Sequence, residues 1–328
     1  MANFSAANAI GITEAANFIP ELWSDEVIAA YKSNLVMGQL VSRMNHKGKK
    51  GDTVHIPAPT RDAGTKANAK AHATQVTLIN DVEGVVDVSI DRHFEYSRLI
   101  EDMAEVQGLS SLRKFYVDDA GYALAKMVDW HLHVLGTGLQ GAALDTSSVD
   151  TPGGNLSYQD GTGAVIGSDG STKWVDTTDG NGAALADAGI RKMIQTLDDV
   201  DVPMSERYMI VPPVEKKNLM GISRFTEQAF TGEAGGANGI RNGLVGDVYG
   251  MPVYVSTNCG HTIDVGGTTK YRAGIMLHKS AFVLIEQMAV RSQTQYKQEF
   301  LADLMTVDTI YGVGELRNDA GIVFIVPA

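Results

Sequence analysis

Three short stretches of the sequence contain residue types that could bind a ligand or catalyse a reaction. GTGLQG at 136–141 fits the G-x-G-x-x-G pattern, whose glycines allow a strand-to-helix turn to hold the pyrophosphate of a dinucleotide. His131 and His133 have the ring nitrogens that bind zinc. Cys259 and His261, two residues apart, could act as a nucleophile and its base. Whether any of these sites can form depends on the elements that carry the residues.

The patterns around these residues argue against all three kinds of site. GTGLQG follows a long helical pattern and not a strand, so we expect it to end a helix. His131 and His133 would point to different sides of that helix, which predicts partly exposed histidines. Nothing in the sequence around Cys259 indicates a lowered thiol pKa or an oriented base. We therefore expect no catalytic residue, no cofactor and no metal, which favours a structural protein.

The composition is that of a folded protein without disulfide bonds. Of 328 residues, 44% are hydrophobic, which is enough for a sizeable core, and a single cysteine excludes a disulfide framework. The formal net charge of −12 argues against tight general binding of nucleic acid. The chain shows no signal-peptide pattern and no apolar stretch of about 18 residues, so we expect a soluble protein with no membrane partner.

Positive charge is concentrated in one segment of this acidic chain. Between Arg43 and Lys70 there are seven cationic residues and two acids, so this segment has a net charge of +5 and the remainder −17. Such asymmetry suits self-association, in which a basic projection of one subunit lies over an acidic surface of the next. A small phosphate-binding patch is the alternative. The candidate contact residues are Lys47, Lys49, Lys50, Arg61, Lys66 and Lys70.

Residues 47–95 are expected to form a long two-stranded excursion that contains these cations. Gly48 and Gly51 permit a sharp departure of the chain, after which TVHI starts a strand. Apolar residues alternate again from Val86 to Ile90, as in a returning strand. A hairpin alone is marginally stable in water, so we expect a neighbouring subunit to support it. Lys47, Lys49 and Lys50 lie at the root of the excursion, where it leaves the rest of the chain. They would then face carboxylates of that neighbour, with a DNA contact as the alternative.

The remaining patterns predict a mixture of helices and strands, which is an α+β fold. An extended arm at 1–19 precedes a helix from Pro20 to about Gly38. Apolar residues at three- and four-residue steps predict a long helix at 110–135 and a second helix at 184–199.

Between those two helices, residues 141–182 are rich in Gly, Ser, Thr and Asp. We expect loops there, with a short hairpin around 164–166 and 174–175. Further strands are expected in RYMIV, GMPVYVSTN, AGIMLHKSAFVLIEQM, VRSQTQYKQ and the C-terminal GIVFIVPA, with a short helix in VEKKNLMG.

Taken in order, several segments resemble the major capsid proteins of tailed double-stranded DNA bacteriophages, which have the HK97-like fold. The podophage and cyanophage members are the most similar. KKGDTVHIPAP at 49–59 is similar to the opening of that family's extended loop, and VGDVYGMPVYVSTN at 245–258 is similar to its axial-domain strands. The other similar segments are 18–36, 92–103, 110–135, 206–220, 278–282 and 311–325.

The resemblance implies a subunit with an N-terminal arm, an extended β-hairpin loop, a peripheral domain with a long spine helix, and an axial domain. The implied segments are 1–46 for the arm and helix, 47–95 for the extended loop, 96–140 for the peripheral domain with the spine helix, 141–182 for a Gly-rich insertion, 183–275 for the axial domain, and 276–328 for the return to the peripheral domain and the C-terminal strand.

The implied function is that of a major capsid protein that self-assembles into pentamers and hexamers of an icosahedral head around phage DNA. The implied location is the virion capsid, with assembly in the host cytoplasm. The implied partners are further copies of the chain, a scaffolding protein, a portal protein and packaged double-stranded DNA in weak non-specific contact. The acidic balance agrees, because tight adhesion would hinder packaging. The starting Met argues against a processed form, which favours a separate scaffolding protein.

Two other functions stay open from the sequence. An encapsulin-like compartment shell would have the same fold around protein cargo, and the Gly-rich insertion at 141–182 favours a phage protein over it. An oligomeric enzyme of an unrecognised type would need catalytic residues, which the motifs do not supply.

Overall fold

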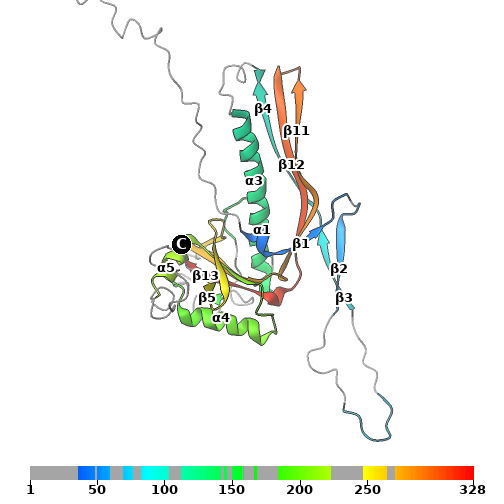
Figure 1. Ribbon diagram of the computed structural model, residues 1–328, viewed down its shortest axis with the longest axis vertical. Helices are drawn as coiled ribbons and strands as arrows, with labels where there is room; N and C mark the ends of the chain where they lie inside the picture. The colour runs from blue at the N-terminus through cyan, green and yellow to red at the C-terminus, as the bar shows by residue number, and fades with distance from the viewer. Residues whose placement is uncertain are drawn as a thin grey trace, which may run out of the picture.

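In the part of the chain that it describes, the computed structural model has three β-sheets with helices packed beside them (Figure 1). It describes residues 36–48, 50–59, 69–76, 83–102, 112–141, 144–145, 150–156, 158, 166–167, 184–222, 247–263 and 270–328.

A seven-stranded sheet forms the centre of the main core. It contains β5 (Ile166–Gly167), β6 (Arg207–Val211), β7 (Asp247–Val248), β8 (Met251–Val255), β9 (His261–Ile263), β10 (Lys270–His278) and β13 (Gly321–Pro327). The strand order is β5-β13-β10-β6-β8-β7, with β9 paired to β10. β13 is buried at every residue from Gly321 to Val326, as expected for an apolar strand that is covered on both faces.

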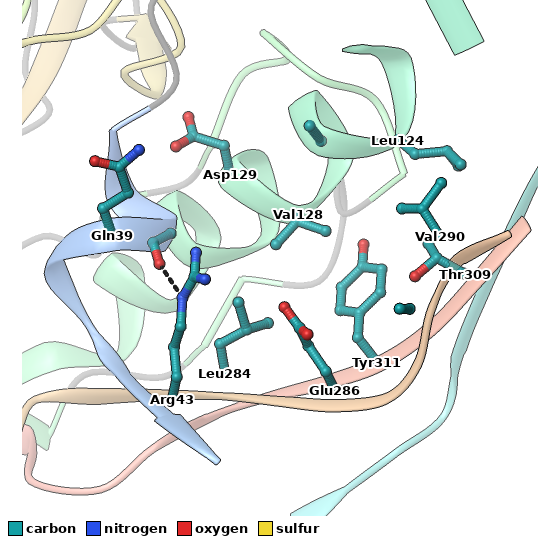
Figure 2. Close-up of a pocket in the computed structure, with 13 residues that line it drawn as sticks. Gln39, Arg43, Leu124, Val128, Asp129, Leu284, Glu286, Val290, Thr309 and Tyr311 are labelled. Atoms are coloured by element: carbon teal, nitrogen blue, oxygen red, sulfur yellow. Dashed lines mark hydrogen bonds between the residues drawn. The ribbon is translucent and has the colours of Figure 1, made fainter. Parts of the chain in front are cut away.

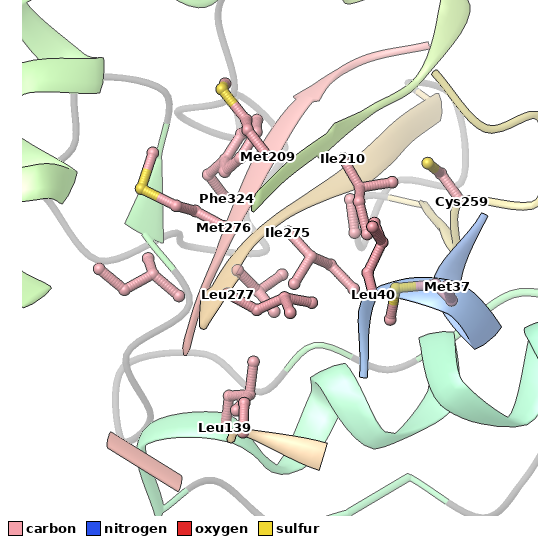
Figure 3. Close-up of a cluster of buried hydrophobic side chains, with 14 of the residues drawn as sticks. Met37, Leu40, Leu139, Met209, Ile210, Cys259, Ile275, Met276, Leu277 and Phe324 are labelled. Carbon is pink, nitrogen blue, oxygen red and sulfur yellow. The ribbon is translucent and has the colours of Figure 1, made fainter. Parts of the chain in front are cut away.

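Two helices accompany this sheet. They are α4 (Asp187–Asp199) and α5 (Pro213–Met220). In α4, Ile190, Met193 and Leu197 recur at three- and four-residue steps and are buried, so this face of the helix packs on the core. Figure 3 shows side chains of β6, β10 and β13 meeting in this core. Both helices were expected from the sequence and are confirmed.

A four-stranded sheet and the longest helix form an arm that extends away from the main core (Figure 1). The arm contains β1 (Ser42–Asn45), β4 (Arg92–Glu101), β11 (Phe282–Lys297), β12 (Ala302–Glu315) and α3 (Leu112–Leu135). The strand order is β1-β11-β12-β4, with β1 parallel to β11 and the other pairs antiparallel. Ala120 and Leu124 of α3 pack on Met305 and Val307 of β12, which joins the helix to the sheet.

The long helix ends where the sequence predicts it. α3 stops at Leu135, and GTGLQG forms the short 3-10 helix η3 (Gly136–Gly141). Because a helix precedes these glycines and no strand does, they cannot form the phosphate-holding turn of a dinucleotide site. A second 3-10 helix, η4 (Asn318–Ala320), separates β12 from β13.

The excursion contains a separate two-stranded sheet of β2 (Thr53–Pro59) and β3 (Glu83–Ser89). The strands are antiparallel, in register from Thr53 opposite Ser89 to Pro59 opposite Glu83. The pair is shorter than the expected 47–95, because β4 starts at Arg92 and pairs with β12 in the arm. Alternation runs through both β3 and β4, so the sequence does not show where the chain changes sheet.

Two other expectations are only partly testable. The helix expected from Pro20 to Gly38 lies largely outside the described residues, and the described helix there is α1 (Met37–Leu40). β5 pairs in parallel with β13, and Trp174–Val175 of the expected hairpin lies outside the described residues. Within the described part of the chain, no helix is long and apolar enough to cross a membrane.

Candidate assembly interface

The chain leaves the arm for the hairpin through a turn that two glycines make possible. Gly48 has φ +76° and Gly51 has φ +139°, values that other residues rarely adopt. The Gln287 side-chain amide donates to the Gly51 carbonyl over 2.9 Å, and the Ile90 N–H donates to the Asp52 carbonyl over 2.7 Å. Hydrogen bonds from Gln287 of β11 and from Ile90, just after β3, therefore fix the chain where it enters the hairpin.

Two glycines of β12 let the base of the hairpin lie directly on the arm. A Cβ atom at Gly312 would be 2.5 Å from the Ser89 carbonyl oxygen, and one at Gly314 would be 2.7 Å from Cγ2 of Val88. Residues two apart in a strand share a face, so the missing side chains of both glycines leave room for β3 on the same face of β12. The hairpin base is thus supported by its own subunit, whereas the sequence analysis expected support from a neighbouring subunit. The buried side chains at this contact are Val88, Ile90, Val283 and Ile285.

The described root lysines differ in their surroundings. Lys47 Nζ lies 3.3 Å from Glu286 Oε2, so an acid of its own chain lies beside it. The sequence could not reveal this pair, because Glu286 is distant in the chain and reaches the root only through β11. Lys50 and Lys70 are exposed. Three other candidates lie outside the described residues: Lys49, Arg61 and Lys66.

Asp129 of α3 joins three segments near this root. One carboxylate oxygen, Oδ1, accepts hydrogen bonds from the N–H groups of Val36 and Met37, over 3.1 and 2.9 Å. The other oxygen, Oδ2, accepts one from the Asn258 side chain over 3.0 Å. The carboxylate therefore satisfies donors at the start of α1 and fastens the loop after β8 to the arm helix.

The two helix histidines are buried, which corrects the expectation that they are partly exposed. His131 Nδ1 lies 2.6 Å from the Tyr311 hydroxyl, and burial lowers the pKa of His133. The last turns of α3 lie between the arm and the main core, so every side of the helix is covered there. A sequence pattern of two polar residues does not show that a helix is enclosed.

Cys259 and His261 do not form a nucleophile and base. Cys259 is fully buried, and burial raises its thiol pKa to about 12. A thiol with so high a pKa is not a nucleophile near neutral pH. His261 is the first residue of β9 and serves its pairing with β10.

An ion-pair cluster crosses the outer part of the arm sheet. Arg291 of β11 donates two hydrogen bonds to Asp308 of β12, over 2.8 and 2.9 Å. His93 of β4 lies 3.2 Å from the same carboxylate. These hydrogen bonds, first of all those from Arg291, hold the pKa of Asp308 below its usual range. Side-chain interactions thereby link β11, β12 and β4 across the arm sheet.

A cavity of about 400 Å³ opens between α1, α3 and the arm sheet (Figure 2). Leu124 and Val128 form an apolar wall, and Arg43 and Glu286 provide charged groups at its edge. Glu286 is also the partner of Lys47, so the cavity adjoins the hairpin root.

A protein-family model described as phage capsid protein matches residues 118–323, which is most of the chain. The chain belongs to this family of phage capsid proteins. Among curated proteins, none matches the sequence.

The capsid protein is also similar in structure to three phage structures over nearly the whole length of each chain. For Mycobacterium phage Che8 the identity is 23%, the TM-score is 0.67, and 94% of this chain and 97% of that chain are covered. For the capsid of cyanophage P-SCSP1u the identity is 16%, the TM-score is 0.69, and the coverage is 98% and 96%. For the capsid of Ralstonia phage GP4 these values are 14%, 0.65, 94% and 95%. The fold is therefore the HK97-like fold.

The family decides between the functions that the sequence left open. The chain is a structural capsid protein of a tailed phage, located in the virion capsid, and it assembles with further copies into a shell. The encapsulin-like compartment and the oligomeric enzyme are not favoured.

Sequence reasoning missed several residues that position the hairpin or fasten the arm of this capsid protein. Gly312 and Gly314 stand two apart in YGVGE, and such spacing within an apolar strand was a readable signal of a close backbone approach. Glu286, Asp129 and Asp308 gave no such signal, because their partners are far away in the sequence.

Proposed function

We propose that this capsid protein forms the pentamers and hexamers of an icosahedral head, and that the hairpin of β2 and β3 makes contacts between subunits. The observation that carries the proposal is the asymmetry of the hairpin's support. Its base is buried against β11 and β12, while Val85, farther out on β3, is 59% exposed in the subunit. A projection that is firmly seated but uncovered beyond its base is suited to lie on a second copy.

The charge distribution supports the same role. Lys50 and Lys70 are exposed in a segment of net charge +5, within a chain of net charge −12. Opposite charges on adjacent copies would favour the correct encounter and register more than they would increase affinity. We propose that these basic residues face acidic groups of neighbours: Lys47, Lys49, Lys50, Arg61, Lys66 and Lys70. Lys47 also has Glu286 of its own subunit beside it.

The proposed division of the subunit into a peripheral and an axial domain follows the two large sheets. The arm, comprising 96–140 and most of 276–328, would be the peripheral domain, and 183–275 with β13 would be the axial domain. Residues 1–46 and 141–182 would be the N-terminal arm and an insertion. A scaffolding protein, a portal protein and packaged DNA are the proposed partners, with assembly in the host cytoplasm. The acidic chain would hold DNA only weakly.

Deletion of 58–76 tests the role of the hairpin. The seat on β12 is made by Val88, Ser89 and Ile90, which the deletion leaves in place, so the subunit should keep its folded core and lose the ability to assemble. Circular dichroism and denaturant unfolding would measure folding, and electron microscopy with light scattering would measure shells. A control that replaces Met204, an exposed residue of the main domain, with Ser should assemble normally. Normal shells from the deleted chain would contradict the proposed role.

A further inference from the structure

A buried histidine lies at the junction between the arm helix and the main core. His133, in the last turn of α3, is fully buried, and no described group forms a hydrogen bond with either of its ring nitrogens. Its Nε2 lies 3.6 Å from Oδ2 of Asp129, one helical turn earlier. That distance is too long for a hydrogen bond but short enough for an ion pair once the ring carries a second proton. His133 therefore has an acid beside it to which it is not yet bonded.

The two oxygens of the Asp129 carboxylate hold different parts of the chain. Oδ1 accepts hydrogen bonds from the N–H groups of Val36 and Met37, and the side chain projects from α3 toward α1 (Figure 2). Oδ2 accepts one from the side-chain amide of Asn258 over 3.0 Å, and it is also the oxygen near His133. Two donors thus compete for Oδ2: the Asn258 amide and the protonated ring of His133.

The bond from Asn258 joins parts of the subunit that belong to different sheets. α3 packs on the arm sheet, whereas Asn258 follows β8 of the seven-stranded sheet. The Asn258 side chain is buried, and its Oδ1 has no hydrogen-bond partner among the described residues. Its amide donates to Asp129 Oδ2 and, over 3.5 Å, to the Lys126 carbonyl. Since hydrogen bonds to a charged group are the stronger kind, loss of Oδ2 would remove most of this hold on α3.

The charges around His133 determine how it responds to pH. Burial lowers the pKa of His133, and the Asp129 carboxylate acts in the opposite direction. The charge of Asp129 also acts on Cys259, which stays a neutral thiol because its pKa is about 12, and α1 contains no titratable side chain. A lowered histidine pKa means that the folded state binds the proton less well than the unfolded state. The contribution to stability is therefore complete above the usual value of about 6.5 and is lost as pH falls toward the lowered pKa.

We infer that Asp129, His133 and Asn258 form a proton-controlled latch between the arm helix and the main core. When His133 gains a proton, Oδ2 of Asp129 turns to the imidazolium and releases the Asn258 amide, so the loop after β8 separates from α3. Oδ1 keeps its hold on the start of α1. In acid the arm and the main core are thus less firmly joined, while each keeps its own sheet. The latch is a property of the single subunit and does not depend on the proposed contacts between subunits.

Amide hydrogen exchange of the full-length subunit at pH 7 and pH 5 tests the latch, with rates corrected for the effect of pH on unstructured peptides. The Asn258 N–H, which donates to Ser256 Oγ within the loop, should lose at least about tenfold of its protection at pH 5. The reason is that each pH unit below about 6.5 favours the protonated, open state about tenfold. The amides of Val36 and Met37 should stay protected at both pH values.

Two results of this experiment would overturn the latch. One is equal protection of the Asn258 amide at both pH values. The other is a loss of protection at Val36 and Met37 together with Asn258, because the whole carboxylate would then have let go instead of turning one oxygen to His133.

Removal of the proton site gives a second test. His133→Phe cannot take up a proton, so its Asn258 amide should be equally protected at pH 5 and pH 7. The matched control is His72→Gln, at an exposed histidine, which should behave like the unaltered chain. Circular dichroism at each pH would establish that the variants are folded. A folded His133→Phe variant that still loses protection in acid would contradict the role of His133.

Removal of the released group tests the same latch from its other side and does not depend on the His133 variant. Asn258→Ala has no side-chain amide for Asp129 to hold. The amide at position 258 should then exchange at similar corrected rates at pH 5 and pH 7, near the rate of the unaltered chain at pH 5. A pH dependence as large as that of the unaltered chain would show that Asn258 is not what the proton releases, and would overturn the inference.

Discussion

β13 and the outer half of β11 belong to the same subunit, yet they differ greatly in their exposure to solvent. β13 is buried from Gly321 to Val326, while β11 is exposed from Ala289 to Tyr296. β13 lies between β5 and β10 in the seven-stranded sheet, whereas beyond Glu286 β11 has β12 as its one described neighbour. Among the described residues, the main core thus covers its own strands, whereas the outer half of β11 is left exposed.

The hairpin base stands between these extremes. Val88 and Ile90 are buried in a small cluster against β11, while residues farther out on β3 are exposed. A subunit built in this way can fold before assembly and still present strand edges that only another copy covers. The comparison thus separates residues that determine folding from residues that determine assembly.

The largest effect is expected in the main core. Phe324→Ala should lower the free energy of unfolding by about 3–5 kcal/mol, because it leaves a cavity at a fully buried ring. The matched Phe300→Ala, at a ring that is 62% exposed in the arm, should change it by less than about 0.5 kcal/mol. Denaturant unfolding of the free subunits measures both. Similar losses for the two variants would contradict the division between a complete core and an open arm.

The seat of the hairpin should give an intermediate effect. Gly312→Ala places a methyl group against the Ser89 carbonyl and should cost about 1–3 kcal/mol by forcing β3 away from β12. Gly121→Ala is the control, since no atom lies within 4 Å of its added methyl group. That change in a helix interior should stabilise the subunit by about 0.5–1 kcal/mol. A neutral Gly312→Ala would show that the hairpin base does not rest on β12.

The ion-pair cluster of the arm should give a smaller effect that depends on pH. Asp308 has a lowered pKa in the folded state, so its contribution is present above the usual aspartate pKa of about 3.9 and is lost as pH falls through the lowered value. Asp308→Asn should lower stability at neutral pH by roughly 1.5 kcal/mol. Unfolding curves from pH 2 to 7 should converge for the two proteins at low pH. A constant difference would mean that the carboxylate charge is not what matters.

Long periodic patterns made much of the fold predictable. The apolar steps of α3 and α4, and the alternation of β3, follow from packing against one side. The place where one sheet gives way to another was not predictable, since β3 and β4 have the same alternation and only Ile90 and Asp91 separate them.

The site was less predictable than the fold for a physical reason. A basic root in an acidic chain indicated an electrostatic contact, but the acid that meets Lys47 depends on the path of β11. The burial of His131 and His133 depends on the position of α3 between two sheets. Such pairings depend on tertiary structure, and local spacing does not contain them.

Amide hydrogen exchange tests the central contrast most directly, by comparing free subunits with assembled shells. The amides of β10 and β13 should be strongly protected in both states, because they are paired within the subunit. The amides of β3 that face away from β2, at Val85 and Asp87, should exchange fast in the subunit and become protected in the shell. Equal protection of this edge in both states, or its continued rapid exchange in shells, would contradict the account.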